Sequence, residues 1–490
     1  MSLLELYVID GTDKLMNAKA TTKAFVAVDL GAQSCRVSLL RWKEEEPSIE
    51  VIHRFPNAPV STRDGLRWDI KTIFSEVMNG LRACAARAPE GISSIAVDGW
   101  AVDYARLDES GNPVPLPFCY RDERTEKAEK EVHSLISPSS LYSLTGIQIL
   151  RLNTLYQLYA DKLAGCDPSL PWLNLPEFIT YRLCGRRVSE YTNATHTALV
   201  KLGTHCWCDE IFGKLGLDMK AAPEIVPTGS VLGPVCAELV GFPAFRDTQV
   251  IVPACHDTAS AIAAIPAVGD DWAFISSGTW SLVGTVLDSP CVTDDARAMN
   301  FTNLGGVGGK ICFLKNVNGM WLLRQCMDEW EQQGFRVSME ELLAGCASLP
   351  APATLIEVDD PQLMLPAHTI HKINAQLARL GHRRFGLDRA DIFDLTNTIF
   401  HSLAARYAEV LAHVSAITRK KLKRLFIVGG GSQNKLLNRL TAQRTGLEVI
   451  LGSPESTTIG NFSVQMAALE QSQSPLVGVS ASSVASWAER

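Results

Sequence analysis

The chain has 490 residues, more than one hydrophobic core can hold, because single cores stop growing near about 250–300 residues. Two domains of similar size are therefore expected. Hydrophobic residues make up 46% of the chain and charged residues 20%, as in ordinary globular proteins. The formal net charge of −7 argues against nucleic acid as a main partner, since a phosphate backbone requires a basic surface. A small phosphorylated ligand is not excluded, because a local group of backbone amides is enough to bind it.

The 13 cysteines are scattered and include no CxxC pair, so neither a disulfide framework nor a zinc ribbon is indicated. This pattern favours a reducing, cytoplasmic location. Possible metal ligands crowd together only in His205-Cys206-Trp207-Cys208, where the lack of a second ligand pair favours a surface turn over a metal site. The N-terminus does not have the pattern of a signal peptide, and no apolar run reaches the length of a membrane span.

The first half of the chain reads as α/β material. Residues 1–22 are weakly patterned and are interpreted as an extension outside the fold. The elements expected after it are a strand at 25–28, a break at Asp29-Leu30-Gly31, a second strand at 37–40, a helix over 70–87 with apolar residues at helical spacing, and a buried strand at 95–97 that ends at Asp98. The two strands form a hairpin whose turn carries glycine and small polar residues.

The second half repeats this order. The expected elements are strands at 272–275 and 282–286 around the turn Ser276-Ser277-Gly278-Thr279, a helix over 392–414 capped by Asp391, a strand at 425–428, the run Gly429-Gly430-Gly431 and a helix from Asn434. Two hairpins that each open one half indicate a duplicated architecture. A strand that leads through glycines into a helix offers backbone for a nucleotide. The division expected is an extension (1–22), an N-terminal domain (23–266), a C-terminal domain (267–475) and a tail (476–490).

Phosphoryl transfer requires backbone donors for phosphates, a carboxylate near the metal ion and a base for the attacking hydroxyl. The usual P-loop is absent, because Leu304 and Ile311 stand where its glycine and its Ser or Thr belong. The glycine run at 305–309 also lacks dinucleotide-binding spacing and is interpreted as a loop.

Two turns and one carboxylate are better candidates. The turns that follow Asp29 and Ser276 occupy equivalent places in the two halves, so two facing phosphate loops can clamp a triphosphate between the domains. Taken singly, each turn is equally explained as an ordinary hairpin. Asp257 follows the apolar residues 250–252 and is a candidate base, although the same carboxylate can simply cap a helix that begins at Thr258.

Together these segments resemble the FGGY family of carbohydrate kinases, which implies a two-domain actin/hexokinase-type ATPase fold with a duplicated core and an interdomain cleft. The resemblance runs from about Phe25 to about Leu469. The strings that carry it are VAVDLGAQSCR (26–36), RWD (67–69), VDGWAVDYARLDESG (97–111), YRDERT (120–125), SLTGIQILRLNTLYQL (143–158), EYTNATHT (190–197), HDTASA (256–261), SSGTWSL (276–282), LKNVNGMWLL (314–323) and IVGGGSQNKLLN (427–438).

The resemblance implies a role for each matching position. Asp257 matches the catalytic base, and Asp29 matches the carboxylate beside magnesium. The sugar-contacting positions are Ala101, His256, Asp257, Thr258 and Asn316. The ATP-contacting positions are Ala32, Gln33, Ser34, Cys35 and Arg36 in the first phosphate loop, and Thr279, Arg324 and Gly430 in the C-terminal half. ATP is then the co-substrate, Mg²⁺ is the metal ion, and no nucleic acid or membrane is involved.

Four positions depart from the pattern that the family leads one to expect. Gln33 and Cys35 replace serine and glycine, Ala101 replaces a glycine and Arg324 replaces a glutamine. Cys35 adds a side chain where backbone is expected to approach a phosphate. None of the four changes removes a catalytic group, so kinase activity is still expected.

Within the family, the strings at 190–197 and 276–282 are similar to the branch that phosphorylates the C1 hydroxyl of L-rhamnulose. L-fuculose and pentuloses are the alternative acceptors, with Asn193, Asn316 and His256 expected to select among them together with the wall near Trp100. From other functional classes, a non-catalytic actin-like ATPase and a sugar-sensing protein remain open, but neither needs a base at Asp257.

Overall fold

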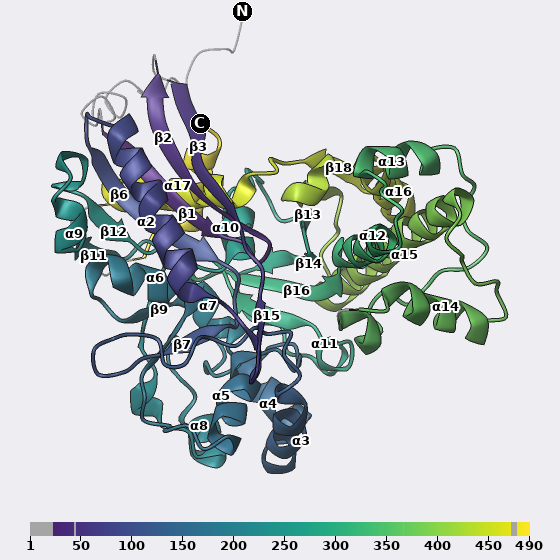
Figure 1. Ribbon diagram of the computed structural model, residues 1–490, viewed down its shortest axis with the longest axis horizontal. Helices are drawn as coiled ribbons and strands as arrows, with labels where there is room; N and C mark the ends of the chain where they lie inside the picture. The colour runs from purple at the N-terminus through teal and green to yellow at the C-terminus, as the bar shows by residue number, and fades with distance from the viewer. Residues whose placement is uncertain (1–22, 44–45, 366, 472–477) are drawn as a thin grey trace, which may run out of the picture.

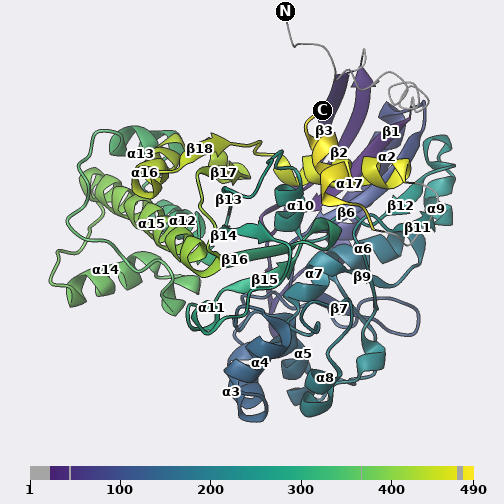
Figure 2. The ribbon, with the colours of Figure 1, turned by 180° about the vertical axis from the view of Figure 1, so that it is seen from behind.

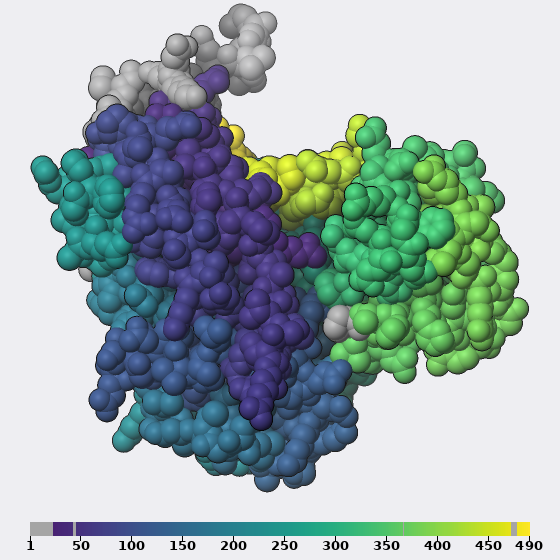
Figure 3. Space-filling view, viewed as in Figure 1, coloured from purple at the N-terminus to yellow at the C-terminus, as the bar shows by residue number. Residues whose placement is uncertain are grey.

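The computed structural model describes residues 23–43, 46–365, 367–471 and 478–490. The extension expected at 1–22 lies outside these residues. Two six-stranded mixed sheets form the frame, one in each half of the chain, and helices cover them (Figure 1). The space-filling view shows the two halves as separate lobes, with the yellow C-terminal segment between them (Figure 3).

The first sheet has the order β11-β12-β6-β1-β2-β3. Its strands are β1 (Ala24–Leu30), β2 (Ser34–Lys43), β3 (Glu46–Pro56), β6 (Ile92–Gly99), β11 (Val231–Pro234) and β12 (Gln249–Ile251). The second sheet has the order β15-β16-β14-β13-β17-β18. Its strands are β13 (Trp272–Ser277), β14 (Trp280–Leu287), β15 (Thr302–Gly305), β16 (Ile311–Asn318), β17 (Arg424–Val428) and β18 (Glu448–Leu451).

The two sheets repeat one topology. In the first, β1 pairs antiparallel with β2 and parallel with β6, while β3 and β12 extend the two sides. In the second, β13 pairs antiparallel with β14 and parallel with β17, while β16 and β18 extend the two sides. The duplicated core predicted from the two hairpins is therefore confirmed, and with it the two-domain α/β fold.

Some helices of the first half lie on its sheet, and others form a separate layer at the bottom of the view in Figure 1. Helix α2 (Ile70–Arg87) turns its apolar side onto β2 and β3, as the spacing of those residues predicts. The other helices are α3 (Thr125–Leu135), α4 (Pro138–Thr145), α5 (Thr154–Leu163), α6 (Leu175–Cys184), α7 (Tyr191–His196), α8 (Asp209–Leu215), α9 (Ala237–Val240) and α10 (Asp257–Ala263). Short strands join them: β4 (Val60–Thr62), β5 (Gly65–Arg67), β7 (Tyr104–Arg106), β8 (Trp172–Asn174), β9 (Val188–Glu190) and β10 (Glu224–Val226).

The second sheet is covered by α15 (Arg389–Thr418), whose buried residues pack with Phe313 and Leu425 in one core. The cap predicted at Asp391 is wrong. The side chain of Asp388 accepts from the Asp391 backbone N–H, so the helix begins one turn earlier. The remaining helices here are α11 (Asp294–Ala298), α12 (Trp321–Gln332), α13 (Met339–Cys346), α14 (Thr369–Arg379) and α16 (Lys435–Thr445). As expected, the latter follows the glycine run, with Asn434 as its capping residue.

The C-terminal segment returns to the first half of the chain. Helices α17 (Ser456–Glu470) and α18 (Ala481–Ala488) pack together, and α17 also lies against α10, β1 and β6 (Figure 2). Phe462 and Trp487 share a buried cluster with Phe25 of β1. Among the described residues, no helix has both the length and the apolar character needed to cross a membrane.

Candidate active site

A cleft of about 340 Å³ lies between the two halves, and segments from both line it. On the N-terminal side these are the β1–β2 turn, residues 100–102 and residues 256–258. On the C-terminal side they are the β13–β14 turn, the glycines after β17 and residues just before α17. The carboxyl ends of parallel strands meet here, where open α/β sheets bind their ligands.

Most of the predicted site residues line this one cleft. They are Asp29, Ala32, Gln33, Ser34, Arg36, Ala101, His256, Asp257, Thr258, Thr279, Asn316 and Gly430. They come from positions as far apart as 29 and 430, so the fold brings both predicted phosphate turns and the predicted base to one site. Of the residues predicted to contact sugar, ATP or metal, Cys35, Arg324 and Asn193 do not line it.

Cys35 points away from the cleft because side chains alternate along β2. Its side chain is fully buried in the N-terminal core, where burial raises the pKa of the thiol to about 12. It therefore does not fill the space that a phosphate needs. Arg324 lies on the exposed side of α12 and pairs with Asp328 at 2.9 Å, so the geometry gives no support to its predicted nucleotide contact.

Three carboxylates gather at the strand ends. Asp29 on β1 is the register partner of Asp98 on β6, and Gly99, the next residue, forms a parallel bridge with His256. The neighbouring strands therefore place Asp29, Asp98 and Asp257 at the same edge of the sheet. Burial raises the pKa of both Asp98 and Asp257, and the charge of Asp29 raises both further, because like charges in a poorly solvated site disfavour ionisation.

Asp257 is the first residue of α10, and His256 occupies the capping position. Its Oδ1 accepts from the backbone N–H of Thr258 at 2.5 Å, so the carboxylate does bond to the helix start, while 34% of the side chain stays exposed. Loss of hydration and the nearby charge of Asp29 raise its pKa to about 7. A group with such a pKa is suited to accept a proton near neutral pH.

A buried hydrogen-bond network holds the backbone before Asp257. Glu190 accepts from the Cys255 N–H at 2.9 Å, from both the N–H and the hydroxyl of Thr192, and from the Thr228 hydroxyl. The hydroxyl of Thr192 in turn accepts from the His256 N–H at 3.3 Å. Glu190 and Thr192 therefore hold the backbone just before Asp257, and neither of them lines the cleft.

Asn193, which the sequence suggested as a sugar contact, is part of this buried layer. It is fully buried, donates to Glu177 at 2.8 Å, and does not line the cleft. His196, three residues further along, does line it, and its ring meets that of His256 edge-on at 4.3 Å. Desolvation lowers the pKa of His196 to about 4, so this ring enters the cleft uncharged.

An aromatic wall forms one end of the cleft around Trp100. Trp100 packs against Trp68 with ring centroids 4.6 Å apart, and both indole N–H groups donate to Asp103. Asp103 also accepts from the backbone N–H of Tyr120, another lining residue. Val102 beside it has a φ of 71°, a strained conformation for a β-branched residue and one typical of functional sites.

Sequence reasoning missed Asp103 as the organiser of this wall, although the residue lies inside a string that carries the family resemblance. A buried acidic residue between aromatic residues is a recognisable signal, because a carboxylate in such a place needs several donors. His196, which also lines the cleft, lies inside the string at 190–197 but was not singled out, whereas Arg54 lies outside all of these strings.

On the other side, the glycines after β17 lie against the β13–β14 turn. A Cβ added to Gly431 would meet Ser277 Oγ at 1.9 Å, and Gly429 has a φ of 79°. Gly430 differs, because a Cβ there would meet no atom within 4 Å. The space beside Gly430 is therefore open to the cleft, as the predicted nucleotide contact requires.

The acidic edge also suits a magnesium ion. Arg36 donates twice to Asp29, both times to Oδ2, which leaves Oδ1 for another partner. Oδ1 of Asp98 is buried without a hydrogen-bond partner among the described residues, and burial and Asp29 raise the pKa of this carboxyl. The described residues include no group of three or more metal-ligating side chains. Mg²⁺ does not need one, since it is bound through one or two carboxylates, water and substrate phosphates.

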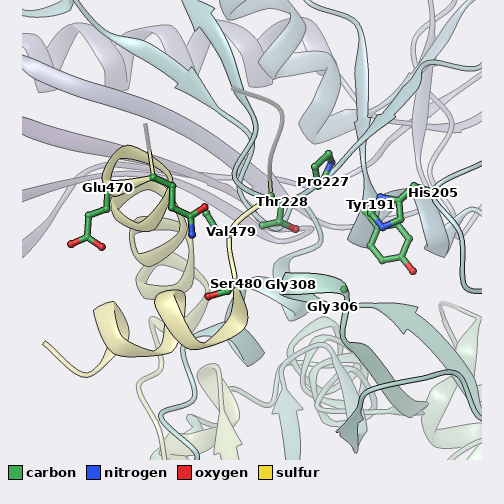
Figure 4. Close-up of a pocket in the computed structure, with 12 residues that line it drawn as sticks. Tyr191, His205, Pro227, Thr228, Gly306, Gly308, Glu470, Val479 and Ser480 are labelled. Atoms are coloured by element: carbon green, nitrogen blue, oxygen red, sulfur yellow. The ribbon is translucent and has the colours of Figure 1, made fainter. Parts of the chain in front are cut away.

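A second cavity, of about 730 Å³, shares no lining residue with the cleft. Tyr191 and His205 stack at its edge, with ring centroids 4.0 Å apart (Figure 4). Gln471 and Gly478 form part of its wall, and they flank residues that the structure does not describe. We therefore assign no function to this cavity.

Comparisons with known proteins agree with this site. Residues 24–264 match the N-terminal domain of the FGGY family of carbohydrate kinases, and residues 273–469 match its C-terminal domain. The chain is 37% identical over 447 residues to a rhamnulokinase from Bacteroides thetaiotaomicron, covering 90% of each chain. It is 35% identical over 456 residues to a rhamnulokinase from Oceanobacillus iheyensis, covering 91% of this chain and 93% of the relative.

Solved structures share the fold at low sequence identity. A xylulose kinase from Lactobacillus acidophilus matches with a TM-score of 0.73 at 16% identity, covering 95% of this chain and 96% of that one. Plasmodium falciparum glycerol kinase with ADP matches with a TM-score of 0.69 at 14% identity, covering 96% and 93%.

The chain therefore belongs to the FGGY family of carbohydrate kinases. It is a carbohydrate kinase with the actin/hexokinase-type ATPase fold, and its co-substrate is ATP. This result decides against the non-catalytic ATPase and the sugar sensor that the sequence had left open.

Proposed function

We propose that the protein transfers the γ-phosphoryl group of MgATP to the C1 hydroxyl of L-rhamnulose, as a step of L-rhamnose breakdown in the cytoplasm. L-rhamnulose is proposed as the substrate because the chain is similar, over about nine-tenths of its length, to relatives named rhamnulokinase. The 13 free thiols agree with a reducing compartment.

In this mechanism Asp257 accepts the proton of the C1 hydroxyl as its oxygen attacks the γ-phosphorus in line. The carboxylate is held at the start of α10, with the Thr258 N–H fixed on one oxygen. Because the transition state is loose, positioning and charge stabilisation supply most of the rate enhancement.

The phosphates would lie between the β1–β2 turn and the β13–β14 turn. Arg36 and residues 32–34, which line the cleft, would face them from one side, and Thr279 would face them from the other. Asp29 would hold the magnesium ion, which neutralises charge on the phosphate oxygens when bound. The adenosine would extend past Gly430, beside which the cleft is open.

The sugar would lie at the aromatic end of the cleft, near Trp100, Ala101 and His256. Asn316 comes to this site from the other half, held by two bonds of 2.9 Å to Gln148. Polar groups such as Asn316 and His256 can reject a misplaced hydroxyl strongly, whereas one methyl group in an apolar pocket is worth about 1–3 kcal/mol, or roughly 10–200-fold. Ala101 is one methyl group larger than the expected glycine, so it reduces the space beside the apolar wall.

The acceptor is tested by measuring kcat/KM side by side for L-rhamnulose, L-fuculose, L-ribulose and D-xylulose under saturating MgATP. We expect L-rhamnulose to give the highest value, because its methyl group meets the Trp100 wall and its hydroxyls meet the polar residues. A clear preference for L-fuculose or a pentulose would overturn the assignment to L-rhamnulose while leaving the kinase mechanism in place.

The nucleotide site is tested by Gly430→Val. A Cβ at this position would meet no protein atom within 4 Å, so we expect the fold to persist while the space for the adenosine is filled. We expect the KM for ATP to rise by roughly 10-fold or more, since even one methylene group in a pocket is worth about 1–3 kcal/mol, with an unchanged KM for the ketose. Calorimetric binding of ATP equal to that of the wild type would move the adenosine elsewhere.

A further inference from the structure

Glu455, the residue before α17, joins two arginines from the opposite half of the chain. Its Oε2 lies 2.5 Å from Arg36 Nη1, and its Oε1 lies 3.5 Å from Arg54 Nη2. Both arginines line the cleft. About a third of the Glu455 side chain is exposed, and half of the Arg54 side chain is.

The backbone around Glu455 is attached to the nucleotide side of the cleft. The Glu455 N–H donates to Ser453 Oγ at 3.0 Å, and the Ser453 carbonyl accepts from the Gly429 N–H at 3.3 Å. Pro454 and Thr457 line the cleft on either side of it. The carboxylate is thus held between the glycines of one half and the first phosphate loop of the other.

The arrangement has the geometry of an anion bridging two guanidinium groups. Each carboxylate oxygen lies within ion-pair distance of one arginine, and guanidinium groups attract carboxylates and phosphates in the same way. Arg36 also keeps its two bonds to Asp29. Arg54, on β3, forms an ion pair with Glu455 and is exposed enough to turn toward another anion.

We propose that Glu455 is a positioning residue that holds Arg36 and Arg54 in the ligand-free cleft and competes with the nucleotide phosphates for them. Its negative charge weakens the binding of the nucleotide and so favours release of ADP. Arg54 is then a further phosphate-binding residue. The inference rests on the proposed placing of the phosphates between the two turns.

The test is the Glu455→Gln variant, with the dissociation constant of MgADP measured by calorimetry in the absence of sugar. Removing one negative charge beside two arginines should tighten MgADP binding by about 3–10-fold at low salt, since a charge in a partly solvated site changes binding by this order. The shift should shrink as KCl is raised, because salt screens it. The KM for ATP should fall with it, while the KM for the ketose stays unchanged. Purely structural damage would instead weaken binding.

Glu448→Gln is the matched control, because it removes the same charge from an exposed position on β18 and should leave MgADP binding unchanged. Arg54→Gln should weaken MgADP binding by about 3–10-fold, and the Glu455→Gln effect should be smaller in that background, as expected for residues in contact. Unchanged or weaker MgADP binding in Glu455→Gln, or an equal effect in both backgrounds, would overturn the inference. Failure of the wild type to bind MgADP would overturn the proposed function instead.

Discussion

Replacing Asp257 with asparagine is expected to lower kcat by about 10²–10⁴-fold, the range for loss of a general base. Asparagine has the same shape, and its side-chain oxygen can still accept from the Thr258 N–H, so the start of α10 should persist. What is lost is the ability to accept the proton of the attacking hydroxyl. Binding of the ketose and of ATP should remain, because other residues provide those contacts.

The pH dependence of the wild type provides an independent check. Desolvation raises the pKa of Asp257 to about 7, and only the ionised carboxylate can act as the base. The value of kcat/KM should therefore rise as the pH increases through about 7 and should be lost below it. The asparagine variant should lose this step. A variant with near-normal kcat and an unchanged melting temperature would show that Asp257 is not the base.

The sequence was most informative where local chemistry is tied to strand ends. Turns after Asp29 and after Ser276, each between two apolar strands, predict both phosphate loops, because a hairpin sets its own geometry within a few residues. The glycine run near Gly430 works in the same way, since strand, glycines and helix follow one another directly. Repetition of this order then predicts the duplicated fold.

Orientation within the first loop could have been read from strand alternation. Ser34 and Arg36 line the cleft, while Cys35, between them, points into the core. Counting Cys35 as a phosphate contact treated five consecutive residues as equivalent, which a strand does not allow. Asn193 is a similar case, because its polar side chain serves the buried layer around Glu177 and Glu190.

Contacts between segments far apart in the chain could not be predicted from the sequence. Glu455 meets Arg36 across more than 400 positions, and Asn461 of α17 donates to Asp98 at 2.6 Å. Helix α17 carries no motif that says which sheet it covers, since its burial is nearly complete on all sides. The placing of this helix on the first sheet depends on tertiary packing rather than on local pattern. The C-terminal domain expected at 267–475 was likewise drawn from the order of elements along the chain, so its bounds stay a prediction.

The second large effect is expected from Asp29→Asn, which should lower kcat by about 10²–10³-fold, the range for removal of one group that stabilises transition-state charge. Asp29 is the predicted carboxylate for magnesium, and its Oδ1 is not used by Arg36. The Mg²⁺ concentration needed for half-maximal rate should rise as well. Both quantities are measured from initial rates over a Mg²⁺ titration at fixed ATP, with Asp288→Asn, an exposed surface substitution, as the control.

Stability should move the other way. Burial raises the pKa of Asp29 despite the two bonds from Arg36, so ionising this carboxyl is less favourable in the folded chain than in the unfolded chain. The raised pKa therefore costs stability: the cost is absent below the pKa of the unfolded chain, grows as the pH rises toward the folded pKa, and stays constant above it. Asparagine removes it, while Arg36 keeps Glu455 as a partner. We expect the ligand-free variant to melt at the same temperature as the wild type or higher, as for other buried charges kept for function. Lower melting with normal Mg²⁺ dependence would instead make Asp29 a structural anchor for Arg36.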